Sequence, residues 1–419
     1  MTSPRDEFLT DYIQLTRRHL LGLGAVGAAA WAMSPLSAAE PQRDAVLQDA
    51  VDKLETWLTP ADKFRDVSRG KPIPHTLPEE KRQEVGLTRE TWKLEVLSDP
   101  ENPARLRKPL SVADGTALDF AGLMTLAEKH AVRFAKVMTC LNIGCPLGTG
   151  VWEGVPLREV LWLTQPRENL RRVFYHGFHN DDPAQMFRSS LPVGRVLEDP
   201  FDLPPVILCY KLNGEWLSPQ RGGPVRIVVP EAYGFKSVKW LTTVVLSNLF
   251  HANDTYANGN NDVDSPLKTF AATLNAPTEV QPDTPFAVTG YAQVGISGLS
   301  KVQVWLQDDA KAADAEDRYF TDAPWVDAAI LSPPAKWGGN LPDDRLPAPL
   351  HNFDAAGQPK SWPLRLTKAH WAVLLPGVPA GKYTLRCRTI DEHGHAQPKP
   401  RPFQKSGHAA IEQVAIRVG

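Results

Sequence analysis

The sequence predicts an α+β protein with two domains, a mixed α/β domain over residues 40–275 and an all-β sandwich over residues 276–419. Its 419 residues are enough for two or three domains of ordinary size. In the first part, some segments space their apolar residues as helices do and others alternate as strands do. Beyond residue 276, alternating segments dominate. Turn residues separate these later segments, a pattern typical of an immunoglobulin-like sandwich.

Composition narrows the class of protein. The 38 prolines exceed the usual share of about 5% and favour short strands and loops over a helical bundle. The formal net charge of −2 provides no basic field, so we expect no nucleic-acid partner. Four cysteines are too few for a disulfide scaffold, and the sequence has no Cys-x-x-Cys-His run, so we expect no haem in this chain.

The N-terminus has the parts of an export signal in their usual order. The basic pair Arg17 and Arg18 precedes an apolar Gly/Ala run over residues 22–33, and small residues follow at 37–39. This order predicts a twin-arginine signal peptide over residues 1–39. The apolar run is too short and too rich in glycine to span a bilayer. We therefore expect a periplasmic protein that does not contact the membrane after signal removal.

Periodicity predicts the secondary structure. Helical spacing marks residues 41–60 and 118–130, and the charged residues 77–90 are read as a solvated helix or loop. Alternation predicts strands over residues 92–97, 132–138, 286–292, 302–306, 371–375, 383–390 and 413–418. Residues 173–179 are read as a strand that runs into a polar loop, and residues 206–212 as a buried strand. Residues 309–365 lack a steady period and are expected to form a long insertion.

Cys140 is the candidate centre of a site. It follows a predicted strand, and a Gly/Pro-rich loop is expected after it, up to a helix that opens at Pro156. A thiol at a strand end beside glycines can face a ligand, although a free cysteine is more often a buried apolar residue. Cys145 could be a second thiol near the site, a disulfide partner or a structural residue.

Basic residues next to glycines indicate an anionic ligand. Glycine backbone N–H groups and arginine side chains suit a phosphate. The three basic clusters are Arg69 with Lys71, Arg221 with Arg226, and Lys236 with Lys239.

Two further segments are candidates for function. Residues 253–264 are rich in Asn, Asp and Gly, include Tyr256, and are expected to form a functional loop. A zinc site formed by His176, His179, Asp181 and Asp182 is an alternative, but the spacing supports it weakly.

Taken in order, these motifs resemble the sulfite oxidase family of molybdopterin-dependent oxidoreductases. The resemblance covers residues 64 to 419. Its motifs are Arg69-Gly-Lys-Pro-Ile-Pro74, Cys140 two positions before Asn142, Trp152-Glu-Gly-Val-Pro-Leu-Arg-Glu-Val-Leu161, Gly223-Pro-Val-Arg226 and Ser237-Val-Lys239-Trp240.

The resemblance implies molybdenum bound by one pyranopterin dithiolene and by the Cys140 thiolate. It places Arg69 toward the substrate and Tyr256 near the metal. The cofactor-binding residues that it implies, together with those from the basic clusters, are Lys71, Asn142, His179, Asp181, Arg221, Arg226, Lys236, Ser237 and Lys239. It also implies an all-β domain that forms a homodimer.

The implied activity is two-electron oxygen-atom transfer, most simply oxidation of sulfite to sulfate, with electrons passed to a c-type cytochrome. In sulfite oxidases a Gly-Asn-Arg-Arg run follows the metal cysteine, whereas here residues 141–145 contain no arginine. The substrate, a small anion, therefore stays open. The alternatives are a reductase of S- or N-oxides and a non-catalytic protein that kept the fold.

Overall fold

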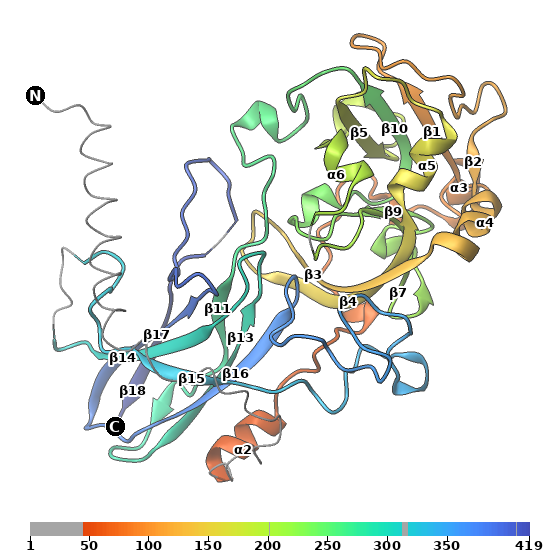
Figure 1. Cartoon of the computed structure of the whole chain (residues 1–419). Helices are drawn as coiled ribbons and strands as arrows, with labels where there is room; N and C mark the ends of the chain where they lie inside the picture. Colours follow the sequence, from red (N-terminus) through yellow and green to blue (C-terminus); the bar gives the residue numbers. More distant parts are fainter. Residues whose placement is uncertain (1–44, 201, 312–316, 408) are drawn as a thin grey trace, which may run out of the picture. The chain divides into compact units, whose positions relative to one another are not determined.

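The structure, a computed structural model, describes residues 45–419 except residues 201, 312–316 and 408 (Figure 1). The predicted signal peptide lies outside the described residues. The α-helices are α2 (Ala45–Asp52), α3 (Glu79–Glu84), α4 (Phe120–His130), α5 (Leu157–Leu163) and α6 (Val193–Leu197). The 3₁₀ helices are η1 (Ala61–Lys63), η2 (Pro74–Thr76), η3 (Pro183–Gln185), η4 (Pro219–Arg221), η5 (Gly234–Lys236), η6 (Ala257–Gly259) and η7 (Pro342–Asp344).

The first part of the chain forms two sheets. One has the strand order β2-β1-β10-β5-β6, in which β1 and β10 are parallel. The other has the order β3-β4-β7-β8, with β9 paired to β7. The strands are β1 (Lys93–Ser98), β2 (Leu118–Asp119), β3 (Val132–Thr139), β4 (Pro146–Pro156), β5 (Arg172–Gly177), β6 (Arg188–Pro192), β7 (Ile207–Leu212), β8 (Glu215–Trp216), β9 (Arg226–Val228) and β10 (Leu241–Ser247).

The loop expected after Cys140 is mostly strand. Residues 141–145 make the turn, and β4 then pairs antiparallel with β3, with Phe134 opposite Trp152. Nearly every residue of β4 is buried, and its glycines and prolines, which are typical of loops, concealed the strand in the sequence. Its glycines allow close strand contact: a Cβ on Gly154 would lie 2.3 Å from the Leu208 carbonyl oxygen.

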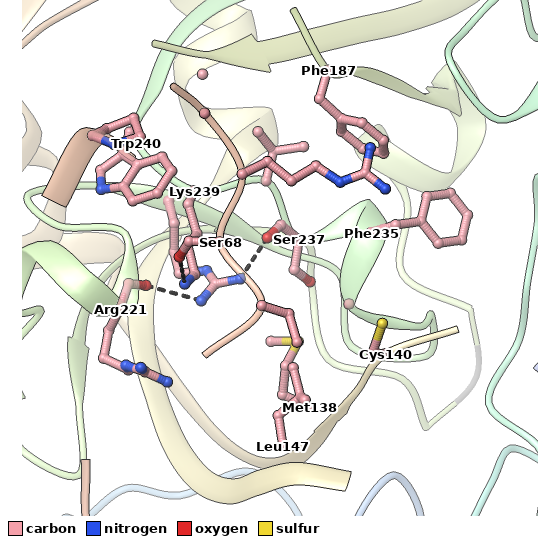
Figure 2. A pocket seen from close by; sticks show the side chains of 18 of the residues that line it. Ser68, Met138, Cys140, Leu147, Phe187, Arg221, Phe235, Ser237, Lys239 and Trp240 are labelled. Atoms are coloured by element: carbon pink, nitrogen blue, oxygen red, sulfur yellow. Dashed lines mark hydrogen bonds between the residues drawn. The ribbon is translucent and has the colours of Figure 1, made fainter. Parts of the chain in front are cut away.

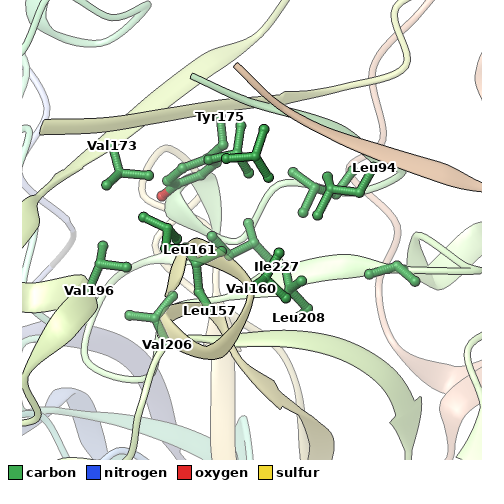
Figure 3. Close-up of a cluster of buried hydrophobic side chains, with 14 of the residues drawn as sticks. Leu94, Leu157, Val160, Leu161, Val173, Tyr175, Val196, Val206, Leu208 and Ile227 are labelled. Atoms are coloured by element: carbon green, nitrogen blue, oxygen red, sulfur yellow. The ribbon is translucent and has the colours of Figure 1, made fainter. Parts of the chain in front are cut away.

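The largest apolar cluster of this part of the chain contains side chains of both sheets and of the short helices. Side chains from β1, β5, β7 and β9 meet those of α5 in this core (Figure 3). Leu157, Val160 and Leu161 are fully buried, as their helical spacing predicts. Pro156 caps the start of α5 instead of forming its first turn. At α4, the Asp119 carboxylate accepts a hydrogen bond from the Gly122 N–H (2.7 Å), which fixes where the helix begins.

The C-terminal part is all β. Its strand order is β11-β13-β16-β15-β14-β17-β18-β12, and its apolar side chains form a separate core. The strands are β11 (Phe270–Asn275), β12 (Glu279–Val280), β13 (Phe286–Gln293), β14 (Lys301–Asp308), β15 (Val326–Ile330), β16 (Lys368–Leu375), β17 (Gly381–Ile390) and β18 (Glu412–Val418). β11 pairs with β13, although it precedes the predicted boundary at residue 276.

Two segments differ from the sequence-based expectation because they pack between the two parts. The helix predicted over residues 41–60 ends at Asp52, and the Leu58 N–H instead donates to the Trp337 carbonyl oxygen (2.8 Å). The predicted insertion contains β15, and its later residues pack with Trp57 and Val151 in one cluster. Among the described helices, none is long and apolar enough to cross a membrane.

Candidate active site

A cavity of about 330 Å³ brings most of the predicted site residues together (Figure 2). Its walls come from residues 64–70, the end of β3, the loop after β5, and residues 234–240. The predicted residues that line it are Arg69, Cys140, Asn142, His179, Arg221, Arg226, Ser237, Lys239 and Tyr256. These residues are separated by up to about 190 positions in the sequence, so only the fold makes them one site.

Three predicted cofactor-binding residues do not line the cavity. Lys71 is exposed, and its backbone N–H donates to Gln185 Oε1 (2.8 Å). Asp181 is an exposed turn residue with φ of +54°. Lys236 is buried, but its ammonium donates to the Ser190 carbonyl oxygen (2.6 Å), away from the cavity. The structure therefore gives these three residues other roles.

One end of the cavity is formed around Cys140. Cys140 and the Phe235 ring lie at the same end of the cavity, away from Arg221 (Figure 2). The Tyr256 ring stacks on Phe235 with centroids 4.0 Å apart, and its hydroxyl donates to Asn142 Oδ1 at 3.5 Å. Burial raises the pKa of Tyr256, so its hydroxyl keeps its proton at neutral pH. A hydrogen-bond donor therefore lies beside the thiol.

Arg69 adds a cation at the same end. Its guanidinium lies 4.9 Å from the centre of the Phe187 ring, a cation–π contact that leaves the N–H groups free to bind an anion. Arg69 is exposed and lines the cavity, so it is accessible to a ligand from solvent. Ile143, Phe187 and Phe235 provide an apolar wall around this position.

The other end of the cavity is cationic. Arg226 begins β9, is 5% exposed, and donates to the carbonyl oxygens of Arg221 (2.9 Å) and Ser237 (2.5 Å). Its guanidinium lies 5.3 Å from the Trp152 ring centre, and that of Arg221 lies 5.9 Å from Phe64. Burial lowers the pKa of Arg226 to about 10, so it remains charged at neutral pH.

Lys239 has an internal counter-ion. Its ammonium donates to Asp66 Oδ1 (2.9 Å), Ser68 Oγ (2.6 Å) and the Gln220 carbonyl oxygen (2.7 Å). Burial and the charge of Arg226 lower the pKa of Lys239 to about 7, against the opposing effect of Asp66. Burial also disfavours the Asp66 carboxylate, but hydrogen bonds from Ser68 and Lys239 outweigh it and hold the pKa of Asp66 well below its usual range.

Unpaired polar atoms indicate what kind of ligand suits the cavity end around Arg221 and Arg226. Arg221 Nε and Nη2, Arg226 Nε and His179 Nδ1 are buried and have no hydrogen-bond partner among the described residues. Buried donors are normally paired, so unpaired arginine N–H groups that line a cavity indicate a missing acceptor, while His179 Nδ1 can donate or accept according to its tautomer. A pterin with a phosphate has such acceptors, and the Cys140 thiol suits a soft metal. The residues therefore fit molybdopterin, with the phosphate at the Arg221 end.

The other cysteines and histidines do not form a second site. Cys145 is a free thiol that accepts a hydrogen bond from Arg65 Nη1 (3.3 Å), while Cys209 and Cys387 are buried in strands. In the described part of the chain, no three His, Cys, Asp or Glu side chains are grouped as metal ligands. This finding disfavours the zinc alternative at His176 and His179.

Sequence reasoning missed several residues of the cavity. Asp66, Ser68, Phe187 and Phe235 contact predicted site residues but were not singled out. Asp66 and Ser68 lie just before Arg69, so the strand-like spacing of residues 66–69 was an available signal. The sequence contained no signal for a site role of Phe187 or Phe235, because an aromatic residue is most often part of a core.

Comparisons with known proteins agree with this geometry. The family described as "Oxidoreductase molybdopterin binding domain" matches residues 85–253. The mitochondrial sulfite oxidase of Drosophila melanogaster is 29% identical over 224 residues, 50% of this chain and 36% of that protein. The NADH nitrate reductase of Spinacia oleracea is 30% identical over 178 residues, 39% of this chain and 19% of that protein. The chain thus spans about a third or less of the length of these curated relatives.

A solved structure matches nearly the whole chain. The sulfane dehydrogenase SoxCD from Paracoccus pantotrophus superposes with a TM-score of 0.54 and covers 94% of this chain and 96% of that chain. The sequence identity is 16%, so this match shows a shared fold: the mixed α/β molybdopterin domain followed by an all-β domain.

Proposed function

Since this chain belongs to the sulfite oxidase family of molybdopterin-dependent oxidoreductases, we propose that it oxidises a small sulfur anion, most simply sulfite, at a molybdenum bound by Cys140. The observation that supports this best is the convergence of Cys140, Arg69 and Tyr256 on a cavity whose far end has unpaired arginine N–H groups. The bound cofactor supplies the two-electron oxygen-atom chemistry, and the protein supplies binding and electrostatics.

Each residue has a distinct task in this proposal. Arg69 holds the anion, because a guanidinium gives two parallel hydrogen bonds to oxygen atoms. The Tyr256 hydroxyl donates a hydrogen bond at the Cys140 end, where negative charge changes during the reaction. The overall reaction is sulfite plus water to sulfate, two protons and two electrons. The electrons leave to an acceptor protein, for which we propose a c-type cytochrome.

A sulfane sulfur compound is the second candidate substrate. The apolar wall of Ile143, Phe187 and Phe235 beside Cys140 favours it, because an uncharged sulfur chain packs better there than a fully charged oxyanion. The sulfane dehydrogenase with the same fold motivates the comparison. The reductase alternative requires the opposite electron flow. Sulfite oxidation and oxidation of an uncharged dialkyl polysulfide, each with an oxidised dye, and sulfoxide reduction with a reduced dye distinguish the three candidate activities.

Metal analysis tests the assignment of Cys140. Protein made in a host that synthesises the cofactor should contain molybdenum, and Cys140→Ser should lose most of it. Cys145→Ser is the matched control, because its thiol lies five residues away on the same turn. Equal metal loss in both variants, or a metal-free wild type, would refute the assignment.

Export and assembly complete the proposal. We propose periplasmic location through the twin-arginine signal, and a homodimer formed by the all-β domain. Replacing Arg17 and Arg18 with lysine should retain the protein in the cytoplasm. Light scattering of the mature protein should give twice the mass of one chain.

A further inference from the structure

The loop with Tyr256, residues 253–264 and here called the tyrosine loop, is held at its start by a buried carboxylate. Asp254 is 2% exposed. Its Oδ1 accepts hydrogen bonds from the backbone N–H groups of Tyr256 and Ala257, both at 3.1 Å. Its Oδ2 accepts a hydrogen bond from Ser190 Oγ (2.8 Å). The carboxylate therefore fixes the backbone of the residue whose hydroxyl reaches the Cys140 end.

Lys236 forms an ion pair with the Asp254 carboxylate. Its ammonium lies 4.0 Å from Asp254 Oδ2 and donates to the Ser190 carbonyl oxygen (2.6 Å). The preceding residue, Phe235, provides the ring on which Tyr256 stacks. Two neighbouring residues thus fix Tyr256 in two ways, one through its backbone and one through its ring.

The all-β domain holds the far end of the tyrosine loop. Arg401 forms an ion pair with Asp262 and donates to the Pro266 carbonyl oxygen (2.7 Å). The Asp262 N–H donates to the Lys405 carbonyl oxygen (2.9 Å), and the Gln404 N–H donates to that of Asn260 (3.0 Å). Asp262 is 4% exposed, so this pair is well shielded from water.

We propose that the Lys236–Asp254 and Asp262–Arg401 pairs are positioning elements that fix Tyr256 beside Cys140, so that the all-β domain contributes to the chemistry. The inference rests on the proposed function, because it assigns Tyr256 a hydrogen bond to the reacting atoms. A displacement of about 1 Å at such a donor can cost up to about 100-fold in rate. Rigid supports for the loop are therefore of direct catalytic value.

A double-mutant cycle on the cofactor-loaded enzyme tests this role. Rates are normalised to molybdenum content. Asp254→Asn keeps an acceptor but removes the charge, and we expect it to lower kcat about 10-fold with little change in KM. In a Tyr256→Phe background the same substitution should change kcat less than twofold, because the hydroxyl it positions is gone. If the two substitutions lowered kcat independently, so that their factors multiply in the double variant, the proposal would be overturned and Asp254 would have only a structural role.

Hydrogen–deuterium exchange of the cofactor-free protein gives an independent readout. Asp254→Asn and Arg401→Gln should each raise exchange in the tyrosine loop at least several-fold, and Arg401→Lys should restore part of the protection. Glu153→Gln, which breaks the partly buried pair with Arg133, is the control and should leave the loop unchanged. Unchanged exchange in both loop variants would overturn the proposal.

The two measurements separate this inference from the proposed function. A wild type that turns over no sulfur compound would refute the function, whereas the exchange data would still decide whether the pairs hold the loop. Arg401 is partly exposed, so its variants should fold even if Asp254→Asn does not.

Discussion

Gly177, at the end of β5, lies against the backbone of the segment that positions Lys239. A Cβ at this position would be 2.0 Å from the Lys239 carbonyl oxygen and 2.8 Å from that of Trp240. Real Cβ contacts below 3.0 Å essentially never occur, so Gly177→Ala must push the two segments apart by about 1 Å. The Phe178 N–H donates to Trp240 O at 2.8 Å, which resists this separation.

The expected cost follows from what has to move. Overpacking costs about 1–3 kcal/mol, and the upper end applies because the obstacles are backbone atoms. The reduced freedom of the unfolded chain returns about 0.5–1 kcal/mol when glycine becomes alanine. The free energy of unfolding should therefore fall by about 2 kcal/mol, which corresponds to a fall in Tm of about 4–8 °C for a domain of about 150–250 residues. The shift also displaces Lys239, so molybdenum content should fall.

Thermal unfolding of the cofactor-free protein, followed by circular dichroism, measures this cost. Gly194→Ala is the matched control. A Cβ there meets nothing within 4 Å, and Gly194 lies in α6, so alanine should raise stability by up to about 1 kcal/mol. A Gly177→Ala protein as stable as the wild type, or loaded with as much metal, would show that the contact does not constrain the site.

Three further predictions concern charge. His370 and Lys368 lower the pKa of Glu55 to about 2 despite the opposing effect of burial, so the pair stabilises the fold above pH 4.5 and is lost as the pH falls toward 2. Glu55→Gln should lower the free energy of unfolding by about 1 kcal/mol at neutral pH, a modest amount because half of that side chain is exposed. In acid denaturation, the difference in stability between the variant and the wild type should shrink below pH 4.5. An anion raises the lowered pKa of Lys239, so calorimetry with pyrophosphate at about pH 8 should detect proton uptake that Lys239→Met abolishes. Asp66→Asn removes the competing carboxylate, and in a titration at about pH 6, where Lys239 is largely protonated, it should tighten pyrophosphate binding about fivefold.

Strand patterning predicted much of the regular part of the fold, because these segments combine apolar residues, alternating or continuous, with an ordinary strand length. β3, β5 and β17 lie close to their predicted positions. β4 was missed because its glycines and its two terminal prolines are typical of a loop, whereas β3 is equally buried but lacks them. The predicted helix over residues 41–60 was too long because Trp57 and Leu58 are buried by tertiary contacts instead of by a helix face.

The sequence predicted only those residues of the candidate site that belong to local motifs. Residues that belong to local motifs, such as Cys140 and Arg226, line the cavity as expected. The partners that set their charge come from elsewhere in the chain: Asp66 lies 173 positions from Lys239. Lys236 was assigned to the cofactor from its neighbours alone. Its ion-pair partner, Asp254, lies in the tyrosine loop, and no local sequence pattern connects the two residues.

The arginine pair that sulfite oxidases carry is absent after Cys140, and basic residues of another segment lie near this turn instead. Residues 141–145 contain no arginine, yet Arg65 and Arg69 both line the same cavity from another segment. Arg65 donates to Cys145 Sγ, so this segment lies directly against the turn that lacks the charges. We therefore propose that the charge that binds an oxyanion comes from residues 64–70. These residues also include Asp66, whose carboxylate holds Lys239 at the opposite end of the cavity. We therefore expect substrate binding and cofactor binding to be coupled through this one segment.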